Sequence, residues 1–501
     1  MNRPLNVPQG AAVLVRKRLS EVTKQSERTF LLGTVLLLTA GSAALGYVLA
    51  QYFAVDIVTS LVFFPEDCYG NWGTNVGRHC FSDYAMVVGA GTRPNPWQPY
   101  PMFPPHAPLR IPYPAAGLLP QLLFGLPAKL LGVPFLGLIG YQVALTIAVV
   151  SPAVWAARGT RGLEQVVVFV ALSAAAIPAW VVIDRGNSVG FVVPVALVFL
   201  VALCRRRWGL VTLMVVLAAL VKPQFAVLAI VLFAARQWRW GGIAVGGIAI
   251  SNFAAYLLWP QDFPQTIAQS IHNLFATSGL YLTDLRNVSF GRALLLIPDY
   301  VHLFQAGKMS DDFLAGPRSL FGYAILILVV ISVLALGRRI SPVMAGIVLL
   351  ATATFFPPLS MFYYLVFVLP VAALVVRDPD GRPGAGIFEE LVTQGQRRRA
   401  VGICVTVAVA LTIAQIALPG PIDHTDIRGQ MGTRGVVGTT VFLAPLLWLI
   451  ACAVILVSYA RRPVSLAGVE EGPDREGPPD TAANASPNAP ELLPESPQGS
   501  A

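Results

Sequence analysis

Most of this chain consists of apolar runs of about twenty residues, the length that a helix needs to cross a bilayer. Short polar or basic segments separate them, and the first run covers residues 30–50. Later runs are predicted to span over residues 133–157, 165–183, 188–204, 241–259, 320–336, 342–356, 361–376, 400–418 and 441–459, with two shorter runs meeting at Lys222-Pro223. The pattern predicts an all-α polytopic membrane protein with a bundle of about 12 transmembrane helices.

Residues 114–133 are apolar but contain Pro114, Pro120 and Pro127. Proline in a helix interior removes a backbone hydrogen bond, which is costly where lipid surrounds the helix. We therefore expect a helix that lies at the outer interface or dips into it, and that does not cross the membrane.

The composition supports the membrane assignment. Of the 501 residues, 55% are hydrophobic and 12% are charged, and the mean hydropathy is +0.66. A soluble domain has about 25% charged residues. The net charge of +9 does not indicate nucleic-acid binding, because the arginines form short clusters between apolar runs. Such clusters mark the cytoplasmic side of a membrane protein.

The arginine clusters set the predicted orientation. Residues 1–29 form a basic cytoplasmic N-terminus, and no small-residue cleavage site follows the first span, so we expect the span to be retained. Residues 30–462 form the transmembrane domain, with a long external loop at 51–113 and a second one at 260–318. Residues 463–501 are rich in proline, alanine and glutamate, which predicts a disordered cytoplasmic tail. The chain is thus predicted to be a multi-pass protein of the cytoplasmic membrane.

The first external loop contains two cysteines, Cys68 and Cys80. Compartments outside the cytoplasm permit disulfides, so we predict that this pair forms one. A ring of this size stabilises a loop by roughly 2–3 kcal/mol in the chain-entropy model. The alternative is two free thiols.

Two charged residues are the main candidates for chemistry. Asp83 lies just after Cys80, and a carboxylate held over a lipid headgroup can act as a general base. The simpler interpretation of Asp83 is a solvated surface charge. Lys222 lies between two apolar runs and could hold an anionic headgroup, or could extend to the interface as lysines near membranes often do. Asp56 is a second candidate for the base.

Several short motifs occur in a set order along residues 80–370. They are Asp83-Tyr84, Tyr100, Tyr113-Pro114, Asp184-Arg185-Gly186-Asn187, residues 218–225 around Lys222, Asn287-Val288-Ser289, and residues 356–360 running into Tyr363-Tyr364. In this order the chain resembles membrane glycosyltransferases of the GT-C fold. More narrowly, it resembles the glycosyltransferase 87 family, the polyprenyl-phosphate-sugar-dependent mannosyl- and arabinofuranosyltransferases of actinobacteria.

The resemblance implies a GT-C-like bundle whose site faces outward, with Asp83 as the base on the acceptor hydroxyl. The implied partners are a polyprenyl-phosphate sugar donor, a glycolipid or cell-envelope glycan acceptor and the bilayer, with no nucleic acid, cofactor or metal. The expected substrate-binding residues are Lys222, Arg185, Asn187, Tyr84, Tyr113, Arg286, Asn287 and Tyr364. The chain departs from mannosyl members of the family in three features: Tyr363-Tyr364 replaces a common histidine pair, Asn187 replaces a frequent glutamine, and the first loop is longer.

Two other classes of function remain open. A flippase or transporter for the same lipid would need titratable groups at mid-bilayer, and the predicted spans contain almost none. A non-catalytic scaffold of a cell-envelope complex would use the first loop to bind a partner. Loss of activity on changing Asp83 alone would distinguish an enzyme from a scaffold.

Overall fold

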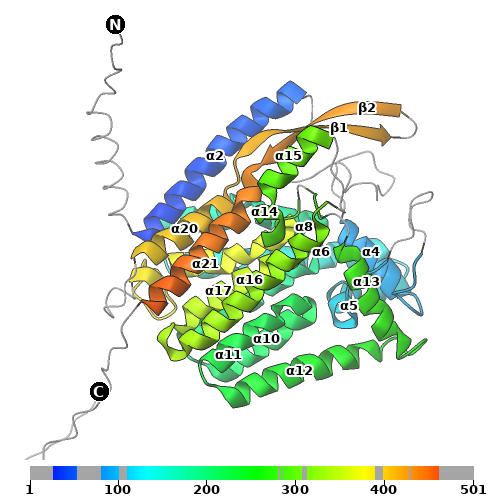
Figure 1. The fold of residues 1–501 in the computed structure, drawn as a ribbon, viewed down its shortest axis with the longest axis horizontal. Helices are drawn as coiled ribbons and strands as arrows, with labels where there is room; N and C mark the ends of the chain where they lie inside the picture. The colour runs from blue at the N-terminus through cyan, green and yellow to red at the C-terminus, as the bar shows by residue number, and fades with distance from the viewer. Residues whose placement is uncertain are drawn as a thin grey trace, which may run out of the picture. The chain divides into compact units, whose positions relative to one another are not determined.

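The computed structural model describes residues 26–53, 81–100, 110–279, 282–284, 286–306, 313–389, 399–427 and 430–461. All of these belong to one compact unit. The unit is mostly helical, as Figure 1 shows. Cys68, Cys80 and Asp56 lie outside the described residues, so the predicted disulfide and the second candidate base remain predictions. The other cysteines, Cys204, Cys404 and Cys452, are free thiols.

Four helices of the described chain are long and apolar enough to cross a membrane. They correspond to α2 (Glu27–Phe53), α6 (Pro134–Ala157), α16 (Ala315–Leu336) and α21 (Ala444–Ala460). A fifth span results if α7 (Leu163–Leu172) and α8 (Ile177–Arg185) are counted together, although they meet at a bend of 53°. In each of the four long helices, a third or less of the most apolar stretch is buried inside the protein. Helices of this length with exposed apolar faces are typical of a membrane protein.

The remaining predicted spans are shorter helices, so the number of about twelve spans is not confirmed and stays a prediction. The shorter apolar helices are α5 (Ala115–Leu130), α9 (Val192–Cys204), α10 (Trp208–Val221), α11 (Ile230–Ala234), α17 (Pro342–Phe355), α18 (Val368–Val376) and α20 (Arg399–Ile413). The helix predicted after Pro114 is present as α5, with Pro120 and Pro127 inside it. The span predicted over residues 241–259 corresponds to α12 (Trp238–Tyr256).

The core lies around α17 and α18. Every residue of α18 is buried, and so is every residue of α17 except Pro342. Helix α18 packs against α2, α6, α7, α9 and α20, while α17 packs against α9, α16 and α21. Trp448 of α21 closes this core, because its ring lies 5.0 Å from that of Phe367 and its indole N–H donates to Thr412. Helices α17 and α18 are thus inside the protein.

Three of the shorter apolar helices begin with a 3₁₀ turn. Turn η2 (Ser188–Phe191) precedes α9, η3 (Pro223–Ala229) precedes α11, and η5 (Phe362–Phe367) precedes α18. Turn η5 packs against α8, η2 and α9. Such 3₁₀ turns are frequent at helix termini. Two further turns, η4 (Gly337–Arg339) and η6 (Thr440–Leu443), flank α16 and α21.

The two predicted external segments pack on each other. The first contributes α4 (Ser82–Gly91), and the second contributes α13 (Gln265–Ser278), α14 (Phe290–Leu294) and α15 (Leu296–Ala306). Trp97 of the first segment packs at the end of α12, where its ring lies 5.1 Å from that of Tyr256 and 5.6 Å from that of Trp259. Asn273 of α13 donates to the Trp97 carbonyl at 2.8 Å. The first segment is therefore partly helical and anchored, where the sequence predicted a loop.

The fold is not wholly helical. Strands β1 (Ala417–Ile427) and β2 (Gln430–Thr439) form an antiparallel hairpin between α20 and α21 (Figure 1). The prediction of an all-α chain is wrong for this segment, which was expected to be a loop. An antiparallel pair with a short connection satisfies its backbone groups locally, so it needs no apolar run to form.

Candidate active site

The candidate base, Asp83, lies in the first turn of α4 and is only 4% exposed. The start of α4 is tied to the end of α8, because the Phe81 amide donates to the Asp184 carbonyl at 3.1 Å. Phe81 takes a left-handed conformation at φ 37° to make this turn. A buried carboxylate is stable only with hydrogen-bond or charge partners. The segment after α8 supplies them.

Residues 184–187 surround the carboxylate of Asp83. Arg185 donates to one oxygen at 3.2 Å, and the amide nitrogen of Asn187 donates to the other. The amide orientation of Asn187 is fixed, because its oxygen accepts from the Val189 amide at 2.9 Å and caps η2. Gly186 makes the turn at φ 64°, where a side chain would be strained and would lie 3.3 Å from Tyr84. The Asp-Arg-Gly-Asn motif therefore positions the carboxylate of Asp83.

The carboxylate of Asp83 retains hydrogen-bonding capacity. A carboxylate has about four lone-pair sites, and Arg185 and Asn187 occupy one on each oxygen. Asp83 can therefore accept a further hydrogen bond from a hydroxyl and then its proton.

Lys222 lies at the break between α10 and η3, and its side chain packs against two tyrosines of the candidate site. Its Nζ lies 3.9 Å from the centre of the Tyr113 ring and 5.7 Å from that of Tyr364. The side chain is 2% exposed, and its ammonium has no hydrogen-bond partner among the described residues. The Asp83 carboxylate acts on it electrostatically. A buried ammonium held only by aromatic faces can bind an anion.

Tyrosines line the space between the two charges. The amide nitrogen of Asn187 lies 3.5 Å from the Tyr113 hydroxyl. Burial raises the pKa of Tyr113 well above its ordinary value, and Asp83 and Tyr364 raise it further. Tyr113 therefore stays a neutral phenol that can donate a hydrogen bond. The Tyr84 hydroxyl is also buried, without a partner in the described structure.

The second external segment pairs with the backbone that leads into η5. The amide of Phe362 donates to the Arg286 carbonyl at 2.9 Å, and that of Val288 donates to the Ser360 carbonyl at 2.7 Å. The Asn287 side chain joins the same pairing, because it donates to the Pro358 carbonyl and accepts from the Ser360 amide. This pairing leads directly into η5 and Tyr364.

The structure brings most of the predicted site residues together. Those that share one cluster of contacts are Asp83, Arg185, Asn187, Tyr113, Lys222 and Tyr364. Tyr84 follows Asp83 in the chain and therefore lies beside this cluster. Arg286 forms an ion pair with Asp284, and the Asn287 amide is occupied by backbone groups, so both hold the backbone that carries η5.

Two further tyrosines adjoin this site: Tyr141, which sequence reasoning missed, and Tyr363, which it noted only as part of a motif. Tyr141 packs on Tyr84 at 4.8 Å between ring centroids, and its hydroxyl donates to the Gly186 carbonyl. The ring of Tyr363 lies 5.9 Å from the Arg185 guanidinium. Tyr141 lies inside an apolar run, where no local signal separates it from core residues.

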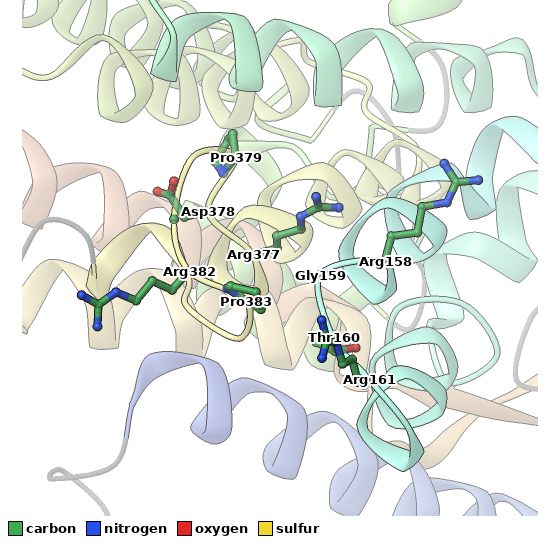
Figure 2. A pocket seen from close by; sticks show the side chains of 10 residues that line it. Arg158, Gly159, Thr160, Arg161, Arg377, Asp378, Pro379, Arg382 and Pro383 are labelled. Carbon is green, nitrogen blue, oxygen red and sulfur yellow. The ribbon is translucent and has the colours of Figure 1, made fainter. Parts of the chain in front are cut away.

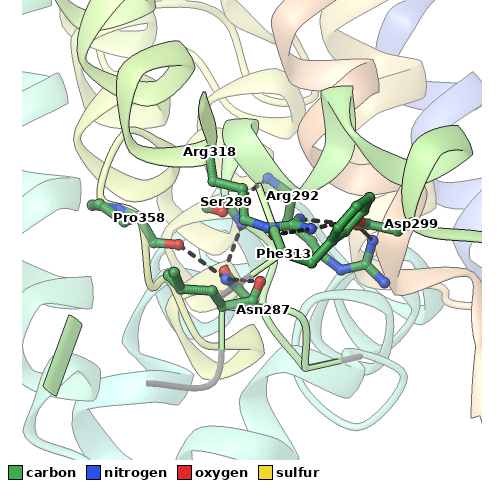
Figure 3. A network of polar contacts seen from close by, with 8 residues as sticks. Asn287, Ser289, Arg292, Asp299, Phe313, Arg318 and Pro358 are labelled. Atoms are coloured by element: carbon green, nitrogen blue, oxygen red, sulfur yellow. Dashed lines mark hydrogen bonds and ion pairs between the residues drawn. The ribbon is translucent and has the colours of Figure 1, made fainter. Parts of the chain in front are cut away.

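Sequence reasoning also missed a buried ion network that holds α15 against α14 and α16. Figure 3 shows the carboxylate of Asp299 between the guanidinium groups of Arg292 and Arg318. Arg318 donates from Nη1 at 2.9 Å, and the side chains of Asp299 and Arg318 are at most 2% exposed. Gly291 permits the close approach of α14 to α16, because a Cβ there would lie 2.1 Å from the Arg318 carbonyl oxygen.

Within the part of the chain that the structure describes, no group of three or more His, Cys, Asp or Glu side chains could hold a metal ion. No family model, curated protein or solved structure matches the chain.

Proposed function

We propose that the protein is a membrane glycosyltransferase of the GT-C type, related to the glycosyltransferase 87 family. It transfers a mannosyl or arabinofuranosyl unit from a polyprenyl phosphate to a hydroxyl of a cell-envelope glycolipid or polysaccharide. One observation carries the proposal. A buried carboxylate, oriented by Arg185 and Asn187, lies beside a buried ammonium that has no hydrogen-bond partner among the described residues.

This pair of charges suits a single displacement at the anomeric carbon. Asp83 takes the proton of the acceptor hydroxyl as its oxygen bonds to the sugar. The bond between the anomeric carbon and the phosphate oxygen breaks, and the released polyprenyl phosphate carries the electron pair. Lys222 stabilises the charge that develops on this phosphate, and neutral Tyr113 can donate to it. Attack from the face opposite the phosphate inverts the configuration.

The predicted orientation places this site at the outer face of the cytoplasmic membrane, in a multi-pass chain. Donor and acceptor are then lipid-linked molecules of the outer leaflet. The exposed apolar faces of the long helices, with Leu37, Phe135 and Leu328 well exposed, suit contact with lipid tails and with the polyprenyl chain.

The proposal is tested with purified protein in proteoliposomes given labelled polyprenyl-phosphate mannose or polyprenyl-phosphate arabinofuranose and an envelope glycolipid extract. Transfer of label to the glycolipid, with release of polyprenyl phosphate, is the expected result. Movement of intact donor to the other leaflet without cleavage would instead support a flippase. If neither donor is cleaved or moved, a scaffold becomes the better assignment.

Changing Lys222 to methionine is expected to weaken donor binding about tenfold to a hundredfold. Hydrogen bonds to charged groups contribute roughly 1.5–3 kcal/mol, and 1.4 kcal/mol corresponds to about a factor of ten. The ammonium contacts the phosphate before and during reaction, so KM should rise at least as much as kcat falls. Initial rates over a range of donor concentrations measure both.

Lys129→Met is the matched control, because Lys129 lies on the exposed face of α5 and donates only to Thr92 at 2.7 Å. It should leave donor binding unchanged. An unaltered KM in Lys222→Met would show that Lys222 does not hold the phosphate.

A further inference from the structure

A cavity of about 190 Å³ lies among the loops that follow α6 and α18. Its walls come from residues 158–161 and from residues 377–383 (Figure 2). Pockets that enclose a drug-sized ligand measure roughly 300–1,000 Å³. This cavity therefore has room for a small group only.

The cavity and the candidate active site lie at opposite ends of the same helices. Residues 362–376, through η5 and α18, lead from Tyr364 beside Lys222 to Arg377 in the cavity wall. Helices α7 and α8 connect Arg161 in the wall to Arg185 at the site. Fifteen helical residues extend roughly 22 Å, so the cavity is distinct from the site.

Positive charge predominates around the cavity. The wall contains four arginines and one carboxylate, that of Asp378: the arginines are Arg158, Arg161, Arg377 and Arg382. Asp378 accepts from the Asp380 amide at 2.8 Å, which holds the turn of this loop. Asp380 is itself paired with Arg205 at 2.8 Å. Asp378 is thus engaged within its own loop, and Asp380 is engaged with the end of α9.

Among the four arginines of the cavity wall, Arg377 is held in place by contacts with Trp155. Its guanidinium donates to the Trp155 carbonyl and lies over the Trp155 ring at 4.7 Å. Gly159 lies against it, since a Cβ there would be 2.7 Å from the Arg377 Cδ. Burial lowers the pKa of Arg377, and repulsion from Arg205 and Arg158 lowers it further. Figure 2 shows Arg158 and Arg382 extending to either side of Arg377.

We propose that this cavity binds a phosphate group at the face of the membrane opposite the candidate active site. Guanidinium groups pair with phosphate oxygens through parallel hydrogen bonds, and several arginines around one small space match a multiply charged oxyanion. Basic pockets between helices on the cytoplasmic side are known to bind anionic lipid headgroups. The phosphate can belong to such a headgroup or to a soluble phosphate. The proposal does not depend on the transferase assignment.

The test uses the full chain purified in a non-ionic detergent. Native mass spectrometry measures bound phosphatidylglycerol against phosphatidylcholine, and thermal unfolding measures stabilisation by inorganic phosphate and pyrophosphate. The wild type should prefer phosphatidylglycerol, or should be stabilised by the soluble anions. The double variant Arg158→Gln/Arg382→Gln, which leaves the anchored Arg377 in place, should reduce that binding by about tenfold.

The control is Arg338→Gln/Arg339→Gln, which removes the same charge from two exposed arginines of η4 outside the cavity. It should retain binding. Loss of lipid binding alone in the cavity variant identifies a headgroup site, and loss of stabilisation by soluble anions identifies a free phosphate. If both double variants lost binding equally, the binding would depend on general surface charge and not on the cavity, and the proposal would be overturned. A wild type that prefers neither lipid nor soluble phosphate would overturn it too.

Discussion

Replacing Asp83 with asparagine is expected to lower the rate of sugar transfer by roughly 10²–10⁴-fold, the usual effect of losing a general base. Asparagine keeps the size of the side chain and can accept a hydrogen bond from one of the two donors, Arg185 or Asn187, but its amide nitrogen replaces the oxygen that serves the other, and it cannot take a proton. Donor binding should change little, because the donor phosphate is assigned to Lys222. The kcat and KM of the purified variant in the transfer assay separate these two effects.

Asp262→Asn provides a matched control. The Asp262 carboxylate also accepts hydrogen bonds from side-chain amides, those of Asn95 and Gln98, but it is exposed and takes no part in the site. Asp262 has a backbone φ of 59°, a conformation that asparagine tolerates well. Near-normal transfer by Asp83→Asn, together with loss of transfer in Asp56→Asn, would move the role of base to Asp56. If neither change matters, the transferase proposal fails.

Asp299→Asn is expected to destabilise the protein by roughly 3–5 kcal/mol, the usual cost of removing one partner from a buried ion pair. Arg292 and Arg318 would then face each other without the carboxylate that now lies between them. The apparent melting temperature of detergent-solubilised protein, followed by tryptophan fluorescence, should fall clearly.

Asp380→Asn is the comparison for this change. It removes the same charge from an ion pair with Arg205 in which the Asp380 side chain is 61% exposed. Exposed pairs contribute about 0–1 kcal/mol, so the melting temperature should hardly move. Equal shifts in the two variants would show that the buried network contributes no more than a surface pair.

The apolar pattern predicted the helical class and the long outer helices well, and the short inner ones less well. Helix α2 was predicted over residues 30–50 and occupies Glu27–Phe53, because length and continuity of apolar residues specify a span facing lipid. Helix α18 is apolar throughout but only nine residues long, since its surroundings are protein. Apolar composition alone cannot distinguish burial in protein from burial in lipid.

The candidate site was predicted as separate motifs, and the structure explains why they belong together. The Asp184-Arg185-Gly186-Asn187 motif was visible in the sequence, but its use as a set of donors for Asp83 depends on α4 packing against α8. The partners of Asp299 could not be predicted at all. A carboxylate in a polar segment normally faces water, and only the chain geometry brings α16 against it.

The packing of Trp448 on Phe367 also constrains how the protein is made. Chains are synthesised from the N-terminus, so α17, η5 and α18 enter the membrane before α21 exists. Until the ribosome reaches α21, the Phe367 ring lacks its covering indole, although η5 already has its partners α8, η2 and α9. The core under η5 is therefore completed late in biogenesis, and a nascent chain stopped before residue 444 would carry the residues of the candidate site on a core that lacks Trp448.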